Sequence, residues 1–172
     1  MLLNVTTLES TRMTTIVKIG KAIAIDSKIT ENGIVLDNDF QKYFDDKKNV
    51  YLFTGSMCNF EAMAKAYRSK SMNKKKSLFI DTTMIVFNKR TGEVTQVKTD
   101  KENRTIKVSP VTCHTYCAGS GRKYAYGAIA NMESDKVDLS HERVAIRAIE
   151  AASKYDNYTS ANINSWVADM QG

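Results

Sequence analysis

The sequence has little of what several classes of protein need. It contains one proline, and no stretch approaches the roughly 20 consecutive apolar residues of a membrane-spanning helix. The opening Met1-Leu2-Leu3 turns polar at Asn4, so no hydrophobic signal core is present there. The three cysteines are an odd number without the spacing of a secreted disulfide scaffold. We therefore expect a cytoplasmic protein that makes no contact with a membrane.

Metal-binding residue types are equally sparse. Cys113, His114 and Cys117 form the one cluster that invites a metal site. If they lie on one strand, Cys113 and Cys117 are about 13 Å apart at about 3.3 Å per residue, and His114 points to the opposite face. Zinc requires ligands within about 2.3 Å of the ion. We therefore expect neither a metal nor another cofactor, and neither His114 nor His141 has a nucleophile at a recognisable spacing.

The charge is unevenly distributed. Lysine and arginine outnumber aspartate and glutamate by 25 − 19 = 6. Six of the positive charges stand close together with no acid among them: Lys65, Arg68, Lys70, Lys74, Lys75 and Lys76. Such a cluster is either a site for anionic partners or a solvated helix end and loop. Because Tyr67 is the one aromatic residue interleaved with it, a nucleic-acid partner is not expected.

The length of 172 residues suits a single domain with a sizeable core. Alternating and apolar runs predict many strands and few helices. A helix is expected from a cap at Asn59 to residue 70, a second over 124–132, and a third capped by Ser140. The expected strands are 13–17 and 22–30, which form a hairpin, then 34–36, 50–54, 78–87, 93–98, 105–108, 111–117 and 163–167. This order predicts two sheets covered by helices.

Two threonines, Thr14 and Thr15, head the first hairpin, and Asp26 follows in its second arm. This arrangement resembles the start of a proteasome-family subunit, in which the first threonine becomes the mature N-terminus and the nucleophile. Asp26 precedes Thr30 by four residues, as in the family's strand-end motif. Lys42 follows Asp26 by sixteen, the separation expected between the family's active-site aspartate and lysine.

Three later segments extend the resemblance to residues 14–167. The first is Phe53-Thr54-Gly55-Ser56, which is similar to the strand that supplies the oxyanion amide. The second is Gly119-Ser120-Gly121, and the third is 155–161, where Asp156 and Thr159 match while Ser160 and Ala161 replace the family's glycines. The short first hairpin resembles small proteasome-like proteins of bacteria and their viruses and the HslV-type peptidase. The resemblance implies an α+β fold, a four-layer αββα sandwich of the N-terminal nucleophile hydrolases.

The resemblance also implies roles for individual residues. Thr14 is the nucleophile and, through its freed amine, the base; the amine's unperturbed pKa is about 7.7–8.0. Lys42 disfavours a second positive charge on that amine, and Asp26 holds Lys42. The Gly55 amide donates to the oxyanion. The other implied residues are an outer catalytic group, Ser120, Asp156 and Thr159, and a group flanking an apolar substrate pocket, Ser27, Thr30, Phe53 and Met57.

Each of these residues also has a purely structural interpretation. Thr14 and Thr15 suit an edge strand, Asp26 and Lys42 a surface ion pair, and Gly55 a strand-to-turn position. Ser120 suits a helix cap, and a turn explains Asp156 with Thr159. On the catalytic interpretation the protein is a threonine peptidase that cleaves peptides or unfolded proteins. The alternative is a catalytically inactive binding or assembly subunit of the same fold.

The stretch before Thr14 decides whether its amine is ever free. Residues 1–13 are an N-terminal extension or propeptide that precedes a single proteasome-like domain over 14–172. Either self-cleavage or initiation at Met13 followed by its removal frees Thr14. Met13 stands where proteasome propeptides usually carry glycine, which disfavours self-cleavage. By resemblance the chain assembles into a homo-oligomeric ring and works with an ATP-dependent unfoldase.

Overall fold

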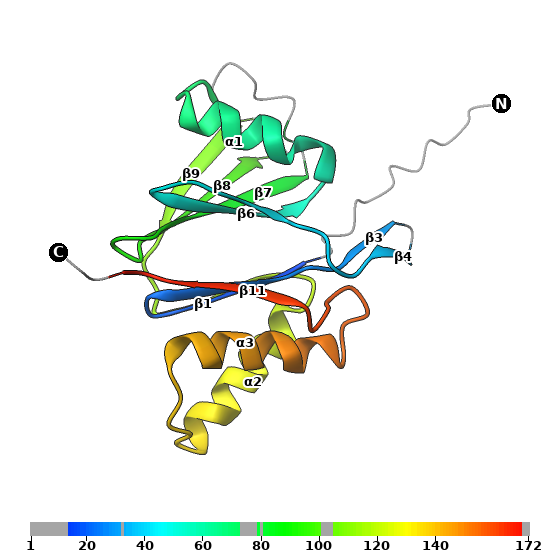
Figure 1. The fold of residues 1–172 in the computed structure, drawn as a ribbon, viewed down its shortest axis with the longest axis vertical. Coiled ribbons are helices and arrows are strands. Elements are labelled where there is room, and N and C mark those ends of the chain that lie inside the picture. Colours follow the sequence, from blue (N-terminus) through cyan, green and yellow to red (C-terminus); the bar gives the residue numbers. More distant parts are fainter. Residues whose placement is uncertain (1–13, 32, 73–78, 80, 101–104, 170–172) are drawn as a thin grey trace.

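The computed structural model describes residues 14–31, 33–72, 79, 81–100 and 105–169. They form four layers, with two sheets stacked face to face and helices on both outer sides (Figure 1). One helix covers the five-stranded sheet and two cover the four-stranded sheet. The αββα sandwich that the sequence predicts is confirmed. The predicted extension over 1–13 lies outside the described residues.

The two main sheets are antiparallel throughout. The four-stranded sheet has the order β10-β1-β2-β11, from β10 (Thr115–Gly119), β1 (Thr15–Ile19), β2 (Ala22–Asp26) and β11 (Ile163–Val167). The five-stranded sheet runs in sequence order through β5 (Tyr43–Asp45), β6 (Asn49–Gly55), β7 (Thr82–Asn88), β8 (Val94–Asp100) and β9 (Thr105–Val111). A separate hairpin pairs β3 (Ile29–Glu31) with β4 (Ile34–Asp37).

The helices begin and end near their predicted positions. The helix α1 (Phe60–Arg68) follows a short 3-10 turn, η1 (Met57–Asn59), and α2 (Arg122–Ser134) and α3 (His141–Ser153) form the opposite layer. Ser140 caps α3 as predicted, because its side chain accepts a hydrogen bond from the Arg143 amide. Asn59 precedes α1, but its side-chain amide donates to Thr82 instead of capping the helix.

Burial of the first hairpin on both faces explains its apolar sequence. Ile16, Ile23 and Ile25 pack between the two sheets, whereas Val17 and Ala24 pack against α2 and α3. Side chains alternate across a strand, so a hairpin covered on both sides is apolar at most positions, and Lys18 is a buried exception whose Nζ donates to the Cys113 carbonyl. The first hairpin therefore contributes to two cores, the one between the sheets and the one beneath α2 and α3.

Several predicted boundaries are wrong, and each error has a local cause. A single strand, β9, runs to Val111 through Pro110, where the sequence suggested two strands. Proline is tolerated there because β9 is an edge strand. Cys113 and His114 consequently lie in the connection to β10 and not on a strand. The short β5 was not predicted, and β7 begins only at Thr82, after Asp81 with its positive φ of 66°.

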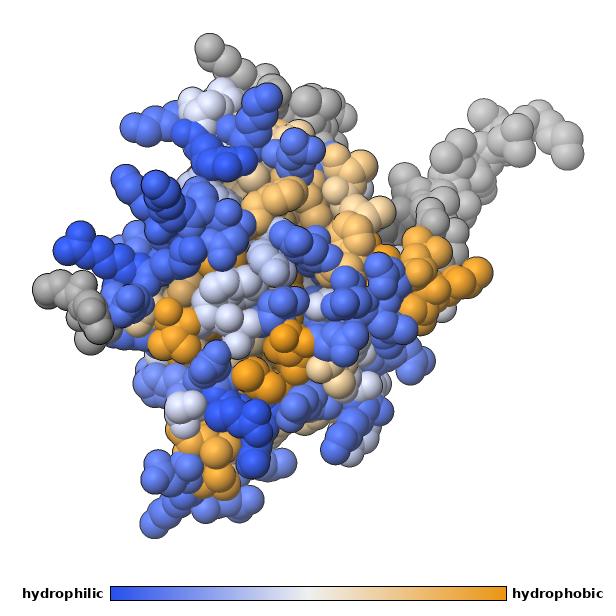
Figure 2. Space-filling model, in the orientation of Figure 1, coloured by the Kyte–Doolittle hydropathy of each residue, from blue (hydrophilic) through white to orange (hydrophobic). Residues whose placement is uncertain are grey.

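An apolar tip projects beside the sandwich. The β3–β4 hairpin extends away from the sheets, and its β4 residues Ile34, Val35 and Leu36 are exposed (Figures 1 and 2). Elsewhere the large apolar side chains lie mostly in three cores, one between each pair of layers. Within the described residues, no helix is both long enough and apolar enough to cross a membrane.

Candidate active site

The residues Thr14, Asp26 and Lys42 meet at one point in the structure. The Lys42 Nζ donates to Thr14 Oγ1 at 3.2 Å and to both carboxylate oxygens of Asp26 at 3.1 Å. All three side chains are buried, and Thr14 is 2% exposed. The lysine therefore bridges a hydroxyl and a carboxylate, and because both members of the ion pair are buried, they are not the surface pair of the structural interpretation.

The stacking of the two sheets brings this cluster together. Asp26 ends β2 and lies across from the start of β1, because Ile25 pairs with Ile16. Lys42 immediately precedes β5 at the edge of the other sheet, and its carbonyl accepts a hydrogen bond from the Phe53 amide. The ion pair between Asp26 and Lys42 thus links the two sheets. Since β5 pairs with β6, the position of Lys42 depends on a strand that carries no strong sequence signal.

Asp26 has an unusually complete set of hydrogen-bond donors. Besides Lys42, its carboxylate accepts backbone hydrogen bonds from Thr15 at 2.7 Å, Lys28 at 3.0 Å and Ser160 at 3.2 Å. The side chain is completely buried. Backbone N–H groups and an ammonium all favour the ionised carboxylate, which offsets the cost of burial. The donors also fix the position of Asp26, and so of the lysine.

Burial moves both members of the pair toward the neutral form. It raises the pKa of Asp26, against the opposing influence of Lys42 and of the backbone donors. It lowers the pKa of Lys42, against the opposing influence of Asp26. Each charge is therefore stabilised chiefly by its partner. Lys42 consequently releases a proton more readily than an exposed lysine does.

A second polar chain lies beside the first and has a defined direction. Thr159 Oγ1 donates to Asp156 Oδ2 at 2.6 Å, so its single proton is committed there. In the 2.6 Å contact between the two hydroxyls, Thr15 Oγ1 must therefore donate to Thr159 Oγ1. Thr15 Oγ1 in turn accepts from the Gly121 amide at 3.1 Å. Ser120 Oγ completes the group by donating to Asp156 Oδ2 at 2.6 Å.

Glycines allow the backbone to approach this site closely. Gly119 has a φ of +93°, and a Cβ added there would lie 1.6 Å from the Thr14 carbonyl oxygen. The next amide, that of Ser120, donates to the same oxygen at 2.9 Å. A Cβ on Gly121 would lie 2.3 Å from Thr15 Oγ1 and 2.8 Å from Thr159 Oγ1. The Gly119-Ser120-Gly121 segment is thus a requirement of the geometry around Thr14 as well as the start of α2.

Substitution of Gly119 by alanine is expected to destabilise the fold strongly. We expect a loss of more than about 3 kcal/mol in the free energy of unfolding, because a positive φ alone costs about 1–3 kcal/mol and the clash with Thr14 adds to it. Chemical denaturation measures the change. The matched control is Gly127→Ala in the exposed face of α2, where an added Cβ meets no atom within 4 Å. That variant should gain about 0.5–1 kcal/mol in stability. Equal stability of the two variants would show that the backbone around Thr14 does not require glycine at position 119.

The other predicted residues are placed as follows. Gly55 ends β6 with a φ of +106°, and a Cβ there would lie 1.8 Å from the Asp81 carbonyl oxygen, so only glycine fits. Phe53 is completely buried and stacks on Phe60 with ring centroids 4.7 Å apart, in the core beneath α1. Its ring therefore belongs to the core beneath α1 and does not line an open pocket. Met57 is 46% exposed in η1.

Ser27 and Thr30 are both buried, close in sequence to Asp26. The Ser27 hydroxyl accepts a hydrogen bond from the Asn164 side chain at 3.0 Å, and its amide donates to the Asn162 carbonyl at 2.9 Å. Thr30 lies on β3. Ser27 is thus tied to the segment that leads into β11, which makes it part of the framework around Asp26.

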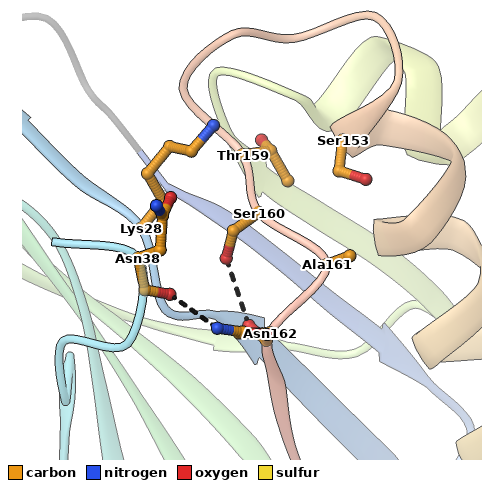
Figure 3. A pocket seen from close by; sticks show the side chains of 7 residues that line it. All are labelled: Lys28, Asn38, Ser153, Thr159, Ser160, Ala161 and Asn162. Carbon is orange, nitrogen blue, oxygen red and sulfur yellow. Dashed lines mark hydrogen bonds between the residues drawn. The ribbon is translucent and has the colours of Figure 1, made fainter. Parts of the chain in front are cut away.

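A polar pocket of about 300 Å³ borders the second polar chain (Figure 3). It is lined by Thr159 and Ser160, which belong to the site, and by Lys28, Asn38, Ser153, Ala161 and Asn162. Ser160 Oγ donates to the Asn162 carbonyl at 3.3 Å, and the Asn162 side chain donates to the Asn38 carbonyl at 3.1 Å. These bonds fix the loop whose Ser160 amide reaches Asp26.

The sequence interpretation missed Thr15 and the Ser160 amide as parts of the site. Thr15 holds Asp26 through its amide and Thr159 through its hydroxyl. A signal was available for Thr15, because alternation along β1 places its side chain opposite in direction to that of Ile16, toward α2 and α3. None was available for Ser160, since a backbone donor leaves no trace in the side-chain pattern.

The cysteine and histidine cluster is separate from the site. Cys113 is exposed and Cys117 is buried, and burial raises the pKa of the Cys117 thiol to about 12. That thiol is therefore protonated at neutral pH and is a poor metal ligand or nucleophile. His114 contacts His141 edge to face, with ring centroids 5.2 Å apart. Among the residues that the structure describes, no group of three histidine, cysteine or acidic side chains is arranged to hold a metal ion.

Comparison with known proteins bears on the fold. No protein-family model matches the sequence, and no curated protein matches it. Solved structures, in contrast, do match this chain. BPH of Thiobacillus denitrificans, in complex with epoxomicin, has a TM-score of 0.69 and 19% identity, covering 92% of this chain and 99% of that one. The eukaryotic HslV of Trypanosoma brucei has a TM-score of 0.65 and 18% identity, covering 89% and 98%.

A second structure of Thiobacillus denitrificans BPH gives a TM-score of 0.60 at 19% identity, covering 92% of this chain and 98% of that chain. The similarity thus extends over nearly the whole length of each protein. At this level of identity it establishes the fold. The resemblance predicted from the sequence is confirmed to that extent: this chain has the proteasome-type fold of the N-terminal nucleophile hydrolases, as HslV does.

Proposed function

We propose that this protein is a threonine peptidase whose nucleophile is Thr14, once the chain begins at that residue. The observation that carries the proposal is the position of the Lys42 Nζ, 3.2 Å from Thr14 Oγ1 and 3.1 Å from the Asp26 carboxylate. A buried lysine that donates to a hydroxyl stabilises the oxyanion character that a nucleophile acquires. A merely structural threonine has no need of such a partner.

The free amine of Thr14 supplies the base. Thr14 Oγ1 attacks the carbonyl carbon of a peptide bond, and its proton passes to the amine, directly or through a water. Collapse of the tetrahedral intermediate breaks the C–N bond, and the amine returns the proton to the leaving group. A water molecule, deprotonated by the same amine, then hydrolyses the ester and restores Thr14. While Met13 is attached, the nitrogen is an amide and cannot accept the proton.

The surrounding residues tune and hold these groups. The Lys42 ammonium disfavours protonation of the nearby amine, and Asp26 keeps Lys42 in place. Gly55 is the proposed donor to the oxyanion, a contribution typically worth about 2.7–4 kcal/mol in the transition state. The proposed outer catalytic group consists of Ser120, Asp156 and Thr159, which are joined by hydrogen bonds to one another and to Thr15. These hydrogen bonds position the start of α2 against Thr14.

The proposed substrate is a peptide or an unfolded protein. The likeness to HslV supports self-association into a ring and cooperation with an ATP-dependent unfoldase. The likeness to a protein solved with epoxomicin makes that compound a useful probe of the site. The proposed substrate pocket is bordered by Met57 and by the Ser27–Thr30 stretch next to Asp26.

The decisive experiment compares two forms of the protein. One is the full chain, and the other is released from a cleavable fusion so that it begins at Thr14, with both termini verified by mass and N-terminal sequencing. We expect the Thr14 form to hydrolyse fluorogenic peptides and to bind epoxomicin, and the full chain to do neither until residues 1–13 are removed. A folded Thr14 form that is inert to a broad peptide library would instead identify a binding or assembly subunit.

A further inference from the structure

A second cavity lies on the side of the five-stranded sheet that faces α1, and none of its lining residues belongs to the site around Thr14. It has a volume of about 650 Å³, which is in the range of about 300–1,000 Å³ typical of small-molecule sites. Its wall comes from the β5–β6 turn, the C-terminal end of α1 and β9. The lining residues that matter here are Lys48, Arg68, Lys70, Tyr67, Met72 and Val108.

The charge in this cavity is predominantly positive. Lys48, Arg68 and Lys70 are all exposed, and within the described residues none of the three side chains has an ion-pair or hydrogen-bond partner. Arg68 lies over the Tyr51 ring, with its guanidinium carbon 5.6 Å from the centroid. This contact leaves its N–H groups available, and an arginine fork suits phosphate oxygens.

The one acid of the cavity is already satisfied. Asp46 accepts backbone hydrogen bonds from Lys48 and Asn49, both at 2.8 Å, and one from the Tyr51 hydroxyl at 2.8 Å. Burial opposes the ionised form, but these donors, together with the nearby positive charge of Arg68, lower the pKa of Asp46 below its ordinary value. The carboxylate therefore holds the β5–β6 turn and Tyr51 in place through hydrogen bonds, and, within the described part of the chain, no side chain of the cavity's three cations donates a hydrogen bond to it.

The remaining wall is apolar and partly aromatic. Tyr67 contacts Tyr51 edge to face, with centroids 6.2 Å apart, which fixes the orientation of its ring. Met72 and Val108 add aliphatic surface, and Val108 is 54% exposed although it lies on the sheet face that α1 covers elsewhere. A flat apolar group can thus be buried next to three cations. Three carbonyls in the last turn of α1 already accept hydrogen bonds from the amides of Ser69, Lys70 and Ser71, so the partial negative charge of this helix end faces the three cations of the cavity.

We propose that this cavity binds a small anion carrying a flat ring, of the nucleoside polyphosphate class. The phosphates lie against Lys48, Arg68 and Lys70, and the base packs against Tyr67, Met72 and Val108. The site is independent of the proposed peptidase chemistry, because none of Thr14, Asp26 and Lys42 lines the cavity. Lys42 pairs with Asp26 at the end of β2, whereas Tyr51 packs in the core beneath α1 and Tyr67 belongs to α1 itself. It also gives a role to part of the basic segment that the catalytic interpretation leaves unused.

Calorimetric titration of the full chain with ATP, adenosine and inorganic tripolyphosphate tests the proposal. We expect ATP to bind more tightly than either fragment. Lys48→Gln and Arg68→Gln should each weaken ATP binding about tenfold, as the loss of one charged hydrogen bond does. Tyr67→Leu should weaken ATP binding about tenfold and leave tripolyphosphate binding unchanged, since stacking on an aromatic ring is worth about 1–3 kcal/mol per base.

The matched control is Lys123→Gln on α2. Lys123 also lies over a tyrosine ring, 4.8 Å from the Tyr124 centroid, but in the opposite helical layer, so ATP binding should not change. Thermal melts test whether each substitution, including that of the half-buried Tyr67, leaves the fold intact. The proposal is overturned if ATP does not bind at millimolar concentration, if tripolyphosphate binds as tightly as ATP, or if an oligonucleotide or an acidic peptide binds more tightly at the same residues.

Discussion

Thr14→Ala, in a protein that begins at residue 14, is expected to abolish peptide hydrolysis. The alanine variant keeps the amine, Lys42 and Asp26 but has no atom that can attack the carbonyl carbon. Removal of the nucleophile from a comparable hydrolase lowers kcat by about 10⁶-fold, so activity should fall to the background of the assay. The measurement is the initial rate of fluorogenic peptide cleavage over a range of substrate concentrations.

Thr14→Ser is the matched control for that experiment. Serine keeps a hydroxyl within reach of the Lys42 Nζ and a free amine, and should therefore retain measurable activity. Binding of epoxomicin and the unfolding midpoint are compared across all three proteins, so that a loss of structure is distinguished from a loss of chemistry. Hydrolysis that persists in the alanine variant would refute Thr14 as the nucleophile.

Lys42→Met is expected to lose both activity and a large part of the stability. The substitution leaves the completely buried Asp26 carboxylate without its counter-charge. Breaking a buried pair in this way costs about 3–5 kcal/mol in the free energy of unfolding. Urea denaturation at pH 7 measures the change, with Lys89→Met as the control. The Lys89–Asp45 pair is about a third exposed on each side, so its loss should cost no more than about 1 kcal/mol.

The pH dependence of the Lys42→Met variant gives a second, independent result. Burial already raises the pKa of Asp26, and loss of the lysine removes an influence that lowers it. When the pKa of a carboxylate is higher in the folded than in the unfolded protein, the folded state binds the proton more tightly. The free energy of unfolding therefore decreases as the pH rises through the folded-state pKa. The deficit relative to the wild type should therefore shrink toward acidic pH. Asp26→Asn combined with Lys42→Met should be less destabilised at pH 7 than Lys42→Met alone, and an equal or larger loss would contradict a buried charged pair.

Local patterns in the sequence were sufficient for most of the fold. Apolar runs and their turns located the first hairpin, the strands β6 and β8 and the three helices. The exceptions have identifiable causes. Pro110 lies within β9, beyond the predicted end of that strand at residue 108, and proline is tolerated there because β9 is an edge strand. The three-residue β5 carries no alternation of its own, because its place is set by pairing with β6.

Part of the site was also predicted, but from the resemblance to the proteasome family and not from local patterns. Residue types and separations placed Thr14, Asp26 and Lys42 in register with the proteasome family, and the structure brings these three together. Spacing along the chain did not reveal that Phe53 points into the core beneath α1. It also did not reveal Thr15 as the link between the two polar chains. Both depend on which face of a strand a residue occupies, and that is decided by packing against the neighbouring layer.

Apart from β5, the sequence alone determined which elements form, because helix and strand periodicity, glycine at positions of positive φ and caps such as Ser140 act over a few residues. Only the tertiary structure decided the chemistry of the pair between Asp26 and Lys42. Their sixteen-residue separation permits a solvated pair worth little as well as a buried one. Stacking of the two sheets excludes water from the pair, and the loss of that water makes the bond between them strong and directs the lysine at Thr14.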